Sequence, residues 1–258
     1  LGDSLPAARI KADKNNLTIY PAGDPTFLNP EFRFQPLAEV LKPYKNISIN
    51  NNGWQTEAKG FGWSWDDYND ADMTERSSLP IYNNVIRFSL KNNRVVPPGS
   101  PVNLMPGKRA DTAIGFDPDT YSVQSVKFFI ERSYGQNDFY LIDSKASFRQ
   151  QSVPFVANPD FIADLLKDTL KAEDVFFFRS DRMDPNYQTA TVIRSQPVDT
   201  LFKPMMFRSN NFYAEQTLLM ASNEHLGFMS ESRMIDTLLK RDLNDIPQKP
   251  RWVDGSGL

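Results

Sequence analysis

The chain has 258 residues, of which 40% are hydrophobic and 24% are charged, and its 29 basic and 32 acidic residues give a formal net charge of −3. These values describe an ordinary soluble protein with enough chain to bury a core in one large domain or two smaller ones. No block of basic residues stands out, so we expect no nucleic-acid-binding surface. The absence of cysteine excludes disulfides, thiol catalysis and zinc–thiolate sites. The apolar runs are far too short to cross a bilayer, so we expect no transmembrane segment.

The first 50 residues predict short elements that are separated by a turn-rich connection. Apolar and alternating residues predict strands at 17–20 and 47–50. A short helix is expected at 34–41, because Pro43 prevents it from continuing. Three prolines and a glycine predict a loop over 21–30.

Residues 53–72 combine aromatic and acidic side chains in one short stretch. They include Trp54, Trp63, Trp65, Tyr68, Asp66, Asp67, Asp70 and Asp72. Paired carboxylates beside aromatic rings are typical of a glycosidase cleft, and exposed indoles stack on sugar rings. Closely spaced oxygens suit calcium, although the glycine that turns an EF-hand loop is missing here. We favour a more ordinary interpretation, in which the tryptophans fill the core of a small domain and the acids cap turns and face water, with no metal and no cofactor.

From residue 83 the sequence becomes typical of β-structure. Alternating apolar and polar residues predict strands near 86–90, 126–131, 140–142 and 153–156. Proline-containing loops are expected at 97–101 and 116–119. Roughly eight strands would form a small sheet or sandwich, with ends uncertain by about two to four residues.

The last hundred residues are richer in helical patterns. Asn158 is a predicted N-cap, Pro159 suits the first helical position, and one apolar face continues to Leu170. A buried strand is expected at 175–178. Further helices are expected at 198–206, 213–220 and 234–239.

Histidine and phosphate chemistry have little support in this sequence. His225 is the only histidine, and it precedes Gly227 in what reads as the end of a helix, where a cationic side chain is a common structural choice. No Gly-x-Ser-x-Gly elbow accompanies it. The glycines at 255 and 257 form too short a run for a phosphate loop and have no lysine.

A Ser-x-Asn triplet, Ser209 to Asn211, lies at a predicted tight corner between two amphipathic helices. Serine and asparagine are also good N-caps, because their short side-chain oxygens accept from free amides in the first turn. The spacing alone therefore favours helix capping over chemistry.

Five phrases, in order along the chain, favour a more specific interpretation. They are GDPTF at 23–27, GWSWDDY at 62–68, RSQPV at 194–198, SNNFYAEQ at 209–216 and DGSGL at 254–258. With them the sequence resembles the penicillin-binding D-alanyl-D-alanine carboxypeptidases/endopeptidases that carry a large insertion between their first two active-site motifs. Each phrase alone is weak, but five in order are fairly specific.

The resemblance implies an α+β multidomain fold. Residues 1–30 would lead out of a serine β-lactamase/transpeptidase-like catalytic domain, 31–190 would form β-rich inserted domains, and 191–258 would return into the catalytic domain with the Ser-x-Asn motif. Ser209 would relay a proton to the leaving D-alanine, and Asn211 would hold the substrate backbone and the catalytic lysine. Asn210 stands where aspartate is common in the family, and it is expected to point away.

Catalysis in this superfamily needs three motifs, Ser-x-x-Lys, Ser-x-Asn and Lys-Thr-Gly. Only the second occurs in this chain. By resemblance the first would precede Leu1 and the third would follow Leu258, so we expect the chain to be the middle of an enzyme and inactive by itself.

The expected function is that of a serine-type D-Ala-D-Ala carboxypeptidase, with endopeptidase action left open. It would act on peptidoglycan stem peptides, bind β-lactams and lie in the cell envelope or periplasm, exported by a signal outside this chain. The alternative is a non-catalytic envelope-binding or scaffold protein of the same fold, in which Ser209 and Asn211 only cap helices.

Overall fold

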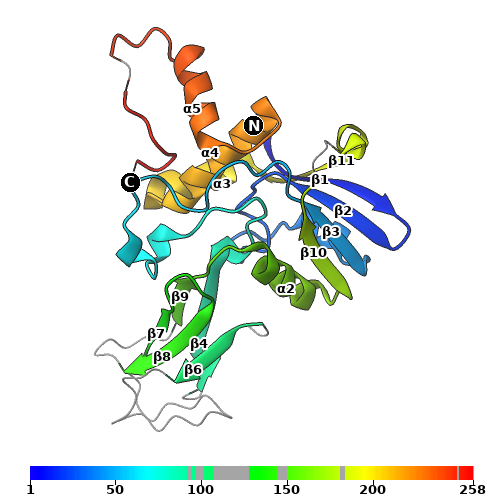
Figure 1. Cartoon of the computed structure of the whole chain (residues 1–258), viewed down its shortest axis with the longest axis vertical. Coiled ribbons are helices and arrows are strands. Elements are labelled where there is room, and N and C mark those ends of the chain that lie inside the picture. Colours follow the sequence, from blue (N-terminus) through cyan, green and yellow to red (C-terminus); the bar gives the residue numbers. More distant parts are fainter. Residues whose placement is uncertain are drawn as a thin grey trace.

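The largest sheet joins the beginning of the chain to its last third. The computed structural model describes residues 1–91, 94–96, 101–106, 128–143, 150–180, 184–248 and 250–257. The sheet has the strand order β10-β3-β2-β1-β11. Its strands are β1 (Ser4–Asp13), β2 (Asn16–Pro21), β3 (Asn46–Asn50), β10 (Asp174–Phe178) and β11 (Thr191–Pro197). β1 is antiparallel to both of its neighbours, whereas β3 is parallel to both of its own (Figure 1).

The strands predicted at 17–20 and 47–50 are confirmed as β2 and β3, but β1 is a strand that the sequence did not predict. Its residues 5–8 are all buried, and its last three residues are exposed. It therefore lacks the alternation that marks a half-buried strand. The strand expected at 175–178 is present as β10, but it is less buried than predicted. Val175 is its one buried residue, and Phe176 is 46% exposed. Among the described residues, β10 pairs only with β3 and therefore forms an edge of the sheet.

The β-rich middle of the chain forms two three-stranded sheets that pack on each other. One has the order β5-β4-β9 and the other β6-β8-β7. The strands are β4 (Val85–Lys91), β5 (Arg94–Val96), β6 (Asn103–Pro106), β7 (Phe128–Arg132), β8 (Asp138–Asp143) and β9 (Gln150–Pro154). The rings of Phe88 and Phe139 lie 5.3 Å apart between the sheets, and both are fully buried. Residue 126 and the expected loops at 97–100 and 116–119 lie outside the described residues.

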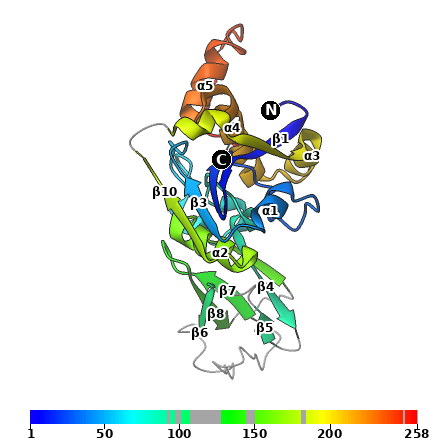
Figure 2. The ribbon, with the colours of Figure 1, turned by 90° about the vertical axis from the view of Figure 1, so that its right-hand side faces the viewer.

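Helix α2 (Pro159–Leu170) lies between the five-stranded sheet and the β-rich part, as Figures 1 and 2 show. The predicted N-cap is confirmed, since the Asn158 side chain accepts from the Phe161 amide at 2.8 Å. The buried face of α2 includes Ile162, Leu165 and Leu166. These residues belong to one hydrophobic core that also includes side chains of both neighbouring parts.

The remaining long helices gather at the end of the molecule away from the β-rich part (Figures 1 and 2). They are α3 (Val198–Arg208), α4 (Asn211–Leu226) and α5 (Glu231–Lys240), while the short α1 (Pro36–Leu41) matches the helix expected there. No helix among the described residues combines the length and the apolar character needed to cross a membrane. The five-stranded sheet takes strands from each of the ranges 1–30, 31–190 and 191–258, and the domain division at those boundaries stays a prediction.

In the segment at 53–72 the acids face water as predicted, but Trp54 and Trp63 do not fill a core. Asp66, Asp67, Asp70 and Asp72 are all exposed. Asp70 accepts from the amide of Asp72 at 3.1 Å and so caps a turn. Trp54 and Trp63 are only half-buried, and the side chain of Trp65 lies outside the described part. Trp63 instead covers a buried guanidinium, with the Arg76 Cζ 5.7 Å from its ring centre.

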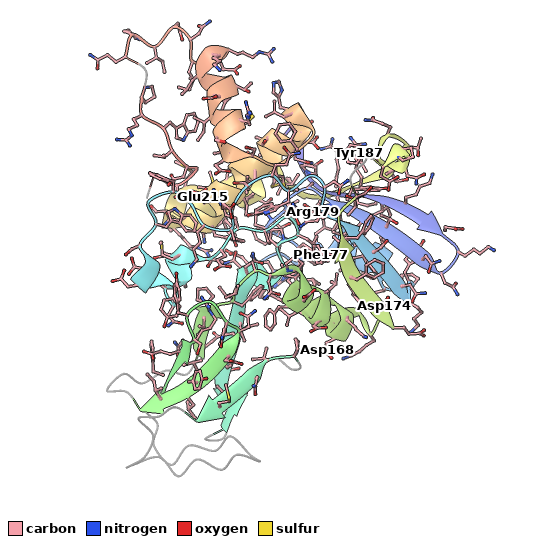
Figure 3. All side chains as sticks on the ribbon, viewed as in Figure 1. Asp168, Asp174, Phe177, Arg179, Tyr187 and Glu215 are labelled. Atoms are coloured by element: carbon pink, nitrogen blue, oxygen red, sulfur yellow. The ribbon has the colours of Figure 1, made fainter. Side chains whose placement is uncertain are left out.

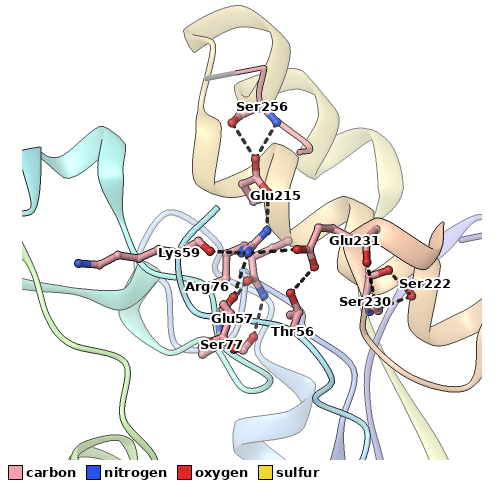
Figure 4. A network of polar contacts seen from close by, with 12 residues as sticks. Thr56, Glu57, Lys59, Arg76, Ser77, Glu215, Ser222, Ser230, Glu231 and Ser256 are labelled. Carbon is pink, nitrogen blue, oxygen red and sulfur yellow. Dashed lines mark hydrogen bonds and ion pairs between the residues drawn. The ribbon is translucent and has the colours of Figure 1, made fainter. Parts of the chain in front are cut away.

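Arg76 is the centre of a buried polar network (Figure 4). It is 1% exposed, and its Nη1 lies 3.1 Å from Oε2 of Glu215 in α4. Its Nη2 donates to the carbonyls of Glu57 and Lys59 at 2.9 Å and lies 3.6 Å from Glu231 at the start of α5. The other oxygen of Glu215 accepts from the amide and the hydroxyl of Ser256, at 2.8 and 2.7 Å. Arg76 and Glu215, with the further contacts that each makes, therefore join α4, α5, the segment at 57–59 and the end of the described chain.

Gln216, which follows Glu215 in α4, makes further hydrogen bonds between α4 and the rest of the chain. Gln216 is fully buried, and its Nε2 donates to the carbonyls of Gly23 and Ser77 at 2.8 and 3.0 Å. Its Oε1 accepts from the amide of Ser77 at 3.2 Å. Gly255 crosses α4 so closely that an added Cβ would lie 2.7 Å from the carbonyl oxygen of Ala214. Only glycine fits there, so the DGSG segment is packed on α4 and its serine is occupied by Glu215.

A buried carboxyl group joins two of the phrases that were noted in the sequence. Asp24 is 2% exposed and accepts from the hydroxyl of Ser195 and from the amide of Thr26, the latter at 2.9 Å. Burial raises the pKa of Asp24, because it disfavours the charged form more than these hydrogen bonds favour it.

This burial gives a testable pH dependence. Since the folded-state pKa of Asp24 lies above its unfolded-state value, the folded protein binds this proton more tightly, and the stability contributed by the carboxyl falls as the pH rises above about 4. Asp24→Asn keeps an acceptor for Ser195 without a charge, so we expect the variant to gain stability relative to wild type between about pH 4 and about pH 7.5. Urea unfolding of both proteins at the two pH values measures this gain, and a stability difference that does not change with pH would contradict it.

Candidate functional site

The Ser-x-Asn triplet forms the predicted corner between two helices. α3 ends at Arg208, and Ser209 follows in the left-handed conformation with φ of 51°, its amide donating to the carbonyl of Met205. Asn210 then caps α4, because its side chain accepts from the amide of Tyr213 at 2.8 Å. Asn211 is the first residue of α4. The corner therefore takes three residues, each with a different backbone role.

Among the side chains of this corner, it is Asn210 that caps a helix, whereas Ser209 ends α3 through its backbone amide alone. Ser209 is exposed and Asn211 is half-buried. Within the described part of the chain, neither side chain makes a hydrogen bond, so the Ser209 hydroxyl and the Asn211 amide remain available to a ligand. A non-glycine residue with positive φ is uncommon and occurs often at functional sites.

Glu31 is a site residue that the sequence did not reveal. One of its carboxylate oxygens pairs with the Arg208 guanidinium, immediately before the corner. The other accepts from the Tyr213 hydroxyl at 2.8 Å, in the first turn of α4. The Asn29 side chain donates to the same hydroxyl at 2.9 Å. One carboxylate therefore holds the end of α3 and the start of α4 together from outside the corner.

Two members of this cluster, Tyr213 and Arg208, have shifted pKa values. Burial, together with the hydrogen bond to Glu31 and its charge, raises the pKa of Tyr213, so this phenol stays neutral and donates to the carboxylate. The hydrogen bond to Glu31 and its charge also raise the pKa of Arg208. Tyr213 is thus a support of the corner and not a base.

The other candidate groups lie elsewhere. His225 is in the last turn of α4, its Nε2 lies 3.0 Å from Nη1 of Arg241, and Gly227 ends the helix with φ of 81°, as predicted. At about 1.5 Å per residue, His225 lies about 20 Å along the helix from Asn211. The residues that the structure describes contain no group of three or more acids or histidines that could hold a metal ion.

Comparisons with known proteins identify a protein family and similar solved structures. The profile of the D-Ala-D-Ala carboxypeptidase 3 (S13) family matches residues 7–258. A search of curated proteins gives no significant match.

Two similar solved structures are of penicillin binding protein 4 (dacB) from Haemophilus influenzae. The first has a TM-score of 0.66 at 15% identity and covers 99% of this chain. The second, in complex with a β-lactam, has a TM-score of 0.59 at 15% identity and covers 100% of this chain. The chain spans 61% and 60% of those two proteins. The fold is therefore that of the α+β penicillin-binding proteins, and the chain belongs to the D-Ala-D-Ala carboxypeptidase 3 (S13) family.

Proposed function

We propose that this chain is the central part of a serine-type D-Ala-D-Ala carboxypeptidase that acts on peptidoglycan stem peptides. The observation that carries the proposal is the corner at 209–211, where the Ser209 hydroxyl and the Asn211 amide are accessible and free of intramolecular hydrogen bonds within the described residues. Membership of the S13 family supplies the reaction class. Support from α4 and from Glu31 gives the corner a fixed geometry.

The reaction proceeds through an acyl-enzyme. A serine activated by a lysine, both outside this chain, attacks the carbonyl between the two D-alanines, and the second D-alanine leaves as an amine. Dividing the hydrolysis in this way replaces one difficult step with two easier ones. The lysine takes the proton of the attacking serine, and the Ser209 hydroxyl relays a proton from the lysine to the departing nitrogen. Such a positioned transfer contributes about 10²–10⁴-fold in rate.

Asn211 orients the substrate and the base. Its amide offers both a donor and an acceptor, which matches the N–H and C=O of a peptide backbone. Asn210 is occupied in capping α4, so the asparagine found where the family often has aspartate serves the helix and not the substrate.

β-Lactam binding and an envelope location follow from the same proposal. A β-lactam carbonyl acylates the serine that a D-Ala-D-Ala carbonyl would, and one of the similar structures is a complex with a β-lactam. The stem peptides lie in the cell wall, so the enzyme acts in the envelope or periplasm.

Replacing the corner hydroxyl tests the proposal directly. In the whole enzyme, Ser209→Ala removes the proton carrier, and we expect release of D-alanine from a D-Ala-D-Ala peptide to slow by about 10²-fold or more. Ser232→Ala, at an exposed serine of α5, is the matched control. Undiminished turnover in Ser209→Ala would remove the assignment. Failure of the wild-type enzyme to be acylated by a labelled penicillin would favour the non-catalytic alternative.

Glu31 is expected to act as a positioning residue. Glu31→Ala releases both Arg208 and Tyr213, so we expect kcat to fall by about tenfold, a barrier change of about 1.4 kcal/mol, with KM nearly unchanged. Glu31→Gln keeps an acceptor for Tyr213 and should recover part of the loss. Glu39→Ala removes an exposed glutamate whose partner is Lys42, and it should leave kcat at the wild-type value. Equal loss in the Ala and Gln variants, or a change confined to thermal stability, would contradict the positioning role.

A further inference from the structure

A pocket of about 700 Å³ lies at the opposite end of α4 from the Ser209 corner. The ends of β2 and β3, the segment at 52–55, the residues after β10 and the C-terminal end of α4 surround it. Figure 3 labels Arg179, which follows β10, and Tyr187, which precedes β11, and both residues line the pocket. Asn223 lines the pocket from α4, and at about 1.5 Å per residue it lies about 18 Å along the helix from Asn211. The pocket is therefore separate from the corner but on the same helix.

The walls of this pocket combine aromatic rings with side-chain amides. The aromatic residues are Tyr20, Trp54, Tyr187 and Phe228, and the amides are Asn50, Asn52, Gln55, Gln188 and Asn223. Aromatic faces give apolar contact without fixed hydrogen-bonding demands, whereas each amide both donates and accepts. A ligand that matches both has apolar C–H faces bordered by hydroxyl and amide groups. That description fits a sugar ring.

The charges in the pocket favour a neutral ligand. Arg179 donates to the backbone carbonyl of Trp54 at 2.8 Å, and no carboxylate pairs with it among the described residues. Asp184 accepts from the Tyr20 hydroxyl at 2.6 Å and from the amide of Asn186 at 2.9 Å. One cation and one anion cancel, so the pocket lacks the positive excess that a phosphate group would require.

A smaller cavity of about 270 Å³ shares Trp54 and Arg179 with this pocket. Two of its lining residues have buried polar atoms without a partner in the described part of the chain, Oδ1 of Asn51 and Nε of Arg76. One is an acceptor and the other a donor, so the cavity offers complementary positions for an N–H and for a C=O. An acetamido group has both an N–H and a C=O.

We propose that the pocket binds an N-acetylated saccharide. The source of that saccharide, the glycan strand of peptidoglycan, rests on the proposed function. A stem peptide of five residues extends to about 17 Å at about 3.3–3.6 Å per residue, which is close to the length of α4 between pocket and corner. A sugar held at one end of α4 would thus present its peptide to the Ser209 end.

Binding of defined saccharides to the whole enzyme tests the inference. Isothermal titration with an N-acetylglucosamine trimer and with the peptidoglycan disaccharide should give saturable binding, and the deacetylated trimer should bind more weakly. Trp54→Ala should weaken binding by at least about tenfold, whereas Phe61→Ala, at a 77% exposed ring outside the pocket, should not change it. Arg179→Gln gives a second variant in case Trp54→Ala does not fold, with Arg233→Gln on α5 as its control.

Two further arms separate this inference from the proposed function. Saccharide binding should persist after a penicillin has acylated the enzyme, because the pocket and the corner are distinct. If acylation succeeds but neither saccharide binds, the pocket inference alone fails. If the saccharides bind but no acylation occurs, the proposed function alone fails. Loss of binding on acylation, binding of the free stem peptide with equal affinity, or no effect of either pocket variant would each overturn the saccharide assignment.

Discussion

The ion pair between Arg76 and Glu215 is the contact on which the position of α4 depends. Both side chains are fully buried, and removing two charges from water costs several kcal/mol per ion unless good geometry and further hydrogen bonds offset it. Here the glutamate also binds Ser256, and the arginine binds two carbonyls and approaches Glu231. The network constrains direction as well as distance, since both terminal nitrogens of Arg76 and both carboxylate oxygens of Glu215 have defined partners.

Function follows from what this fixed helix carries at its two ends. Its first residue belongs to the corner where the Ser209 hydroxyl makes no hydrogen bond to the described residues, and Glu31 pairs with Arg208 beside that corner. Its last turn forms part of the pocket that we assign to a saccharide. Because the network holds α4 between these two places, the proposed proton transfer and the proposed saccharide binding would share one helix, which is the arrangement that precise catalytic geometry requires.

Local signals in the sequence predicted much of this structure, and contacts between distant residues did not emerge from it. The cap at Asn158, the helix end at Gly227 and the corner at 209–211 depend on neighbouring residues, so short patterns were sufficient. The partners Arg76 and Glu215 are 139 positions apart, and no periodicity connects them. Glu31 is likewise recognised only once the fold brings it to the corner. The prediction that the tryptophans fill a core is wrong for a related reason. Trp63 covers the guanidinium of Arg76, and the sequence does not show that this guanidinium is buried.

A double-mutant cycle on Arg76 and Glu215 tests the central claim most directly. Urea unfolding of Arg76→Met, Glu215→Gln and the double variant gives the coupling free energy between the two side chains. We predict that each single variant loses about 3–5 kcal/mol, and that the double variant loses less than the sum by at least about 1 kcal/mol. Losses that add to within about 0.5 kcal/mol would show that the two residues act independently, and α4 would then need another anchor.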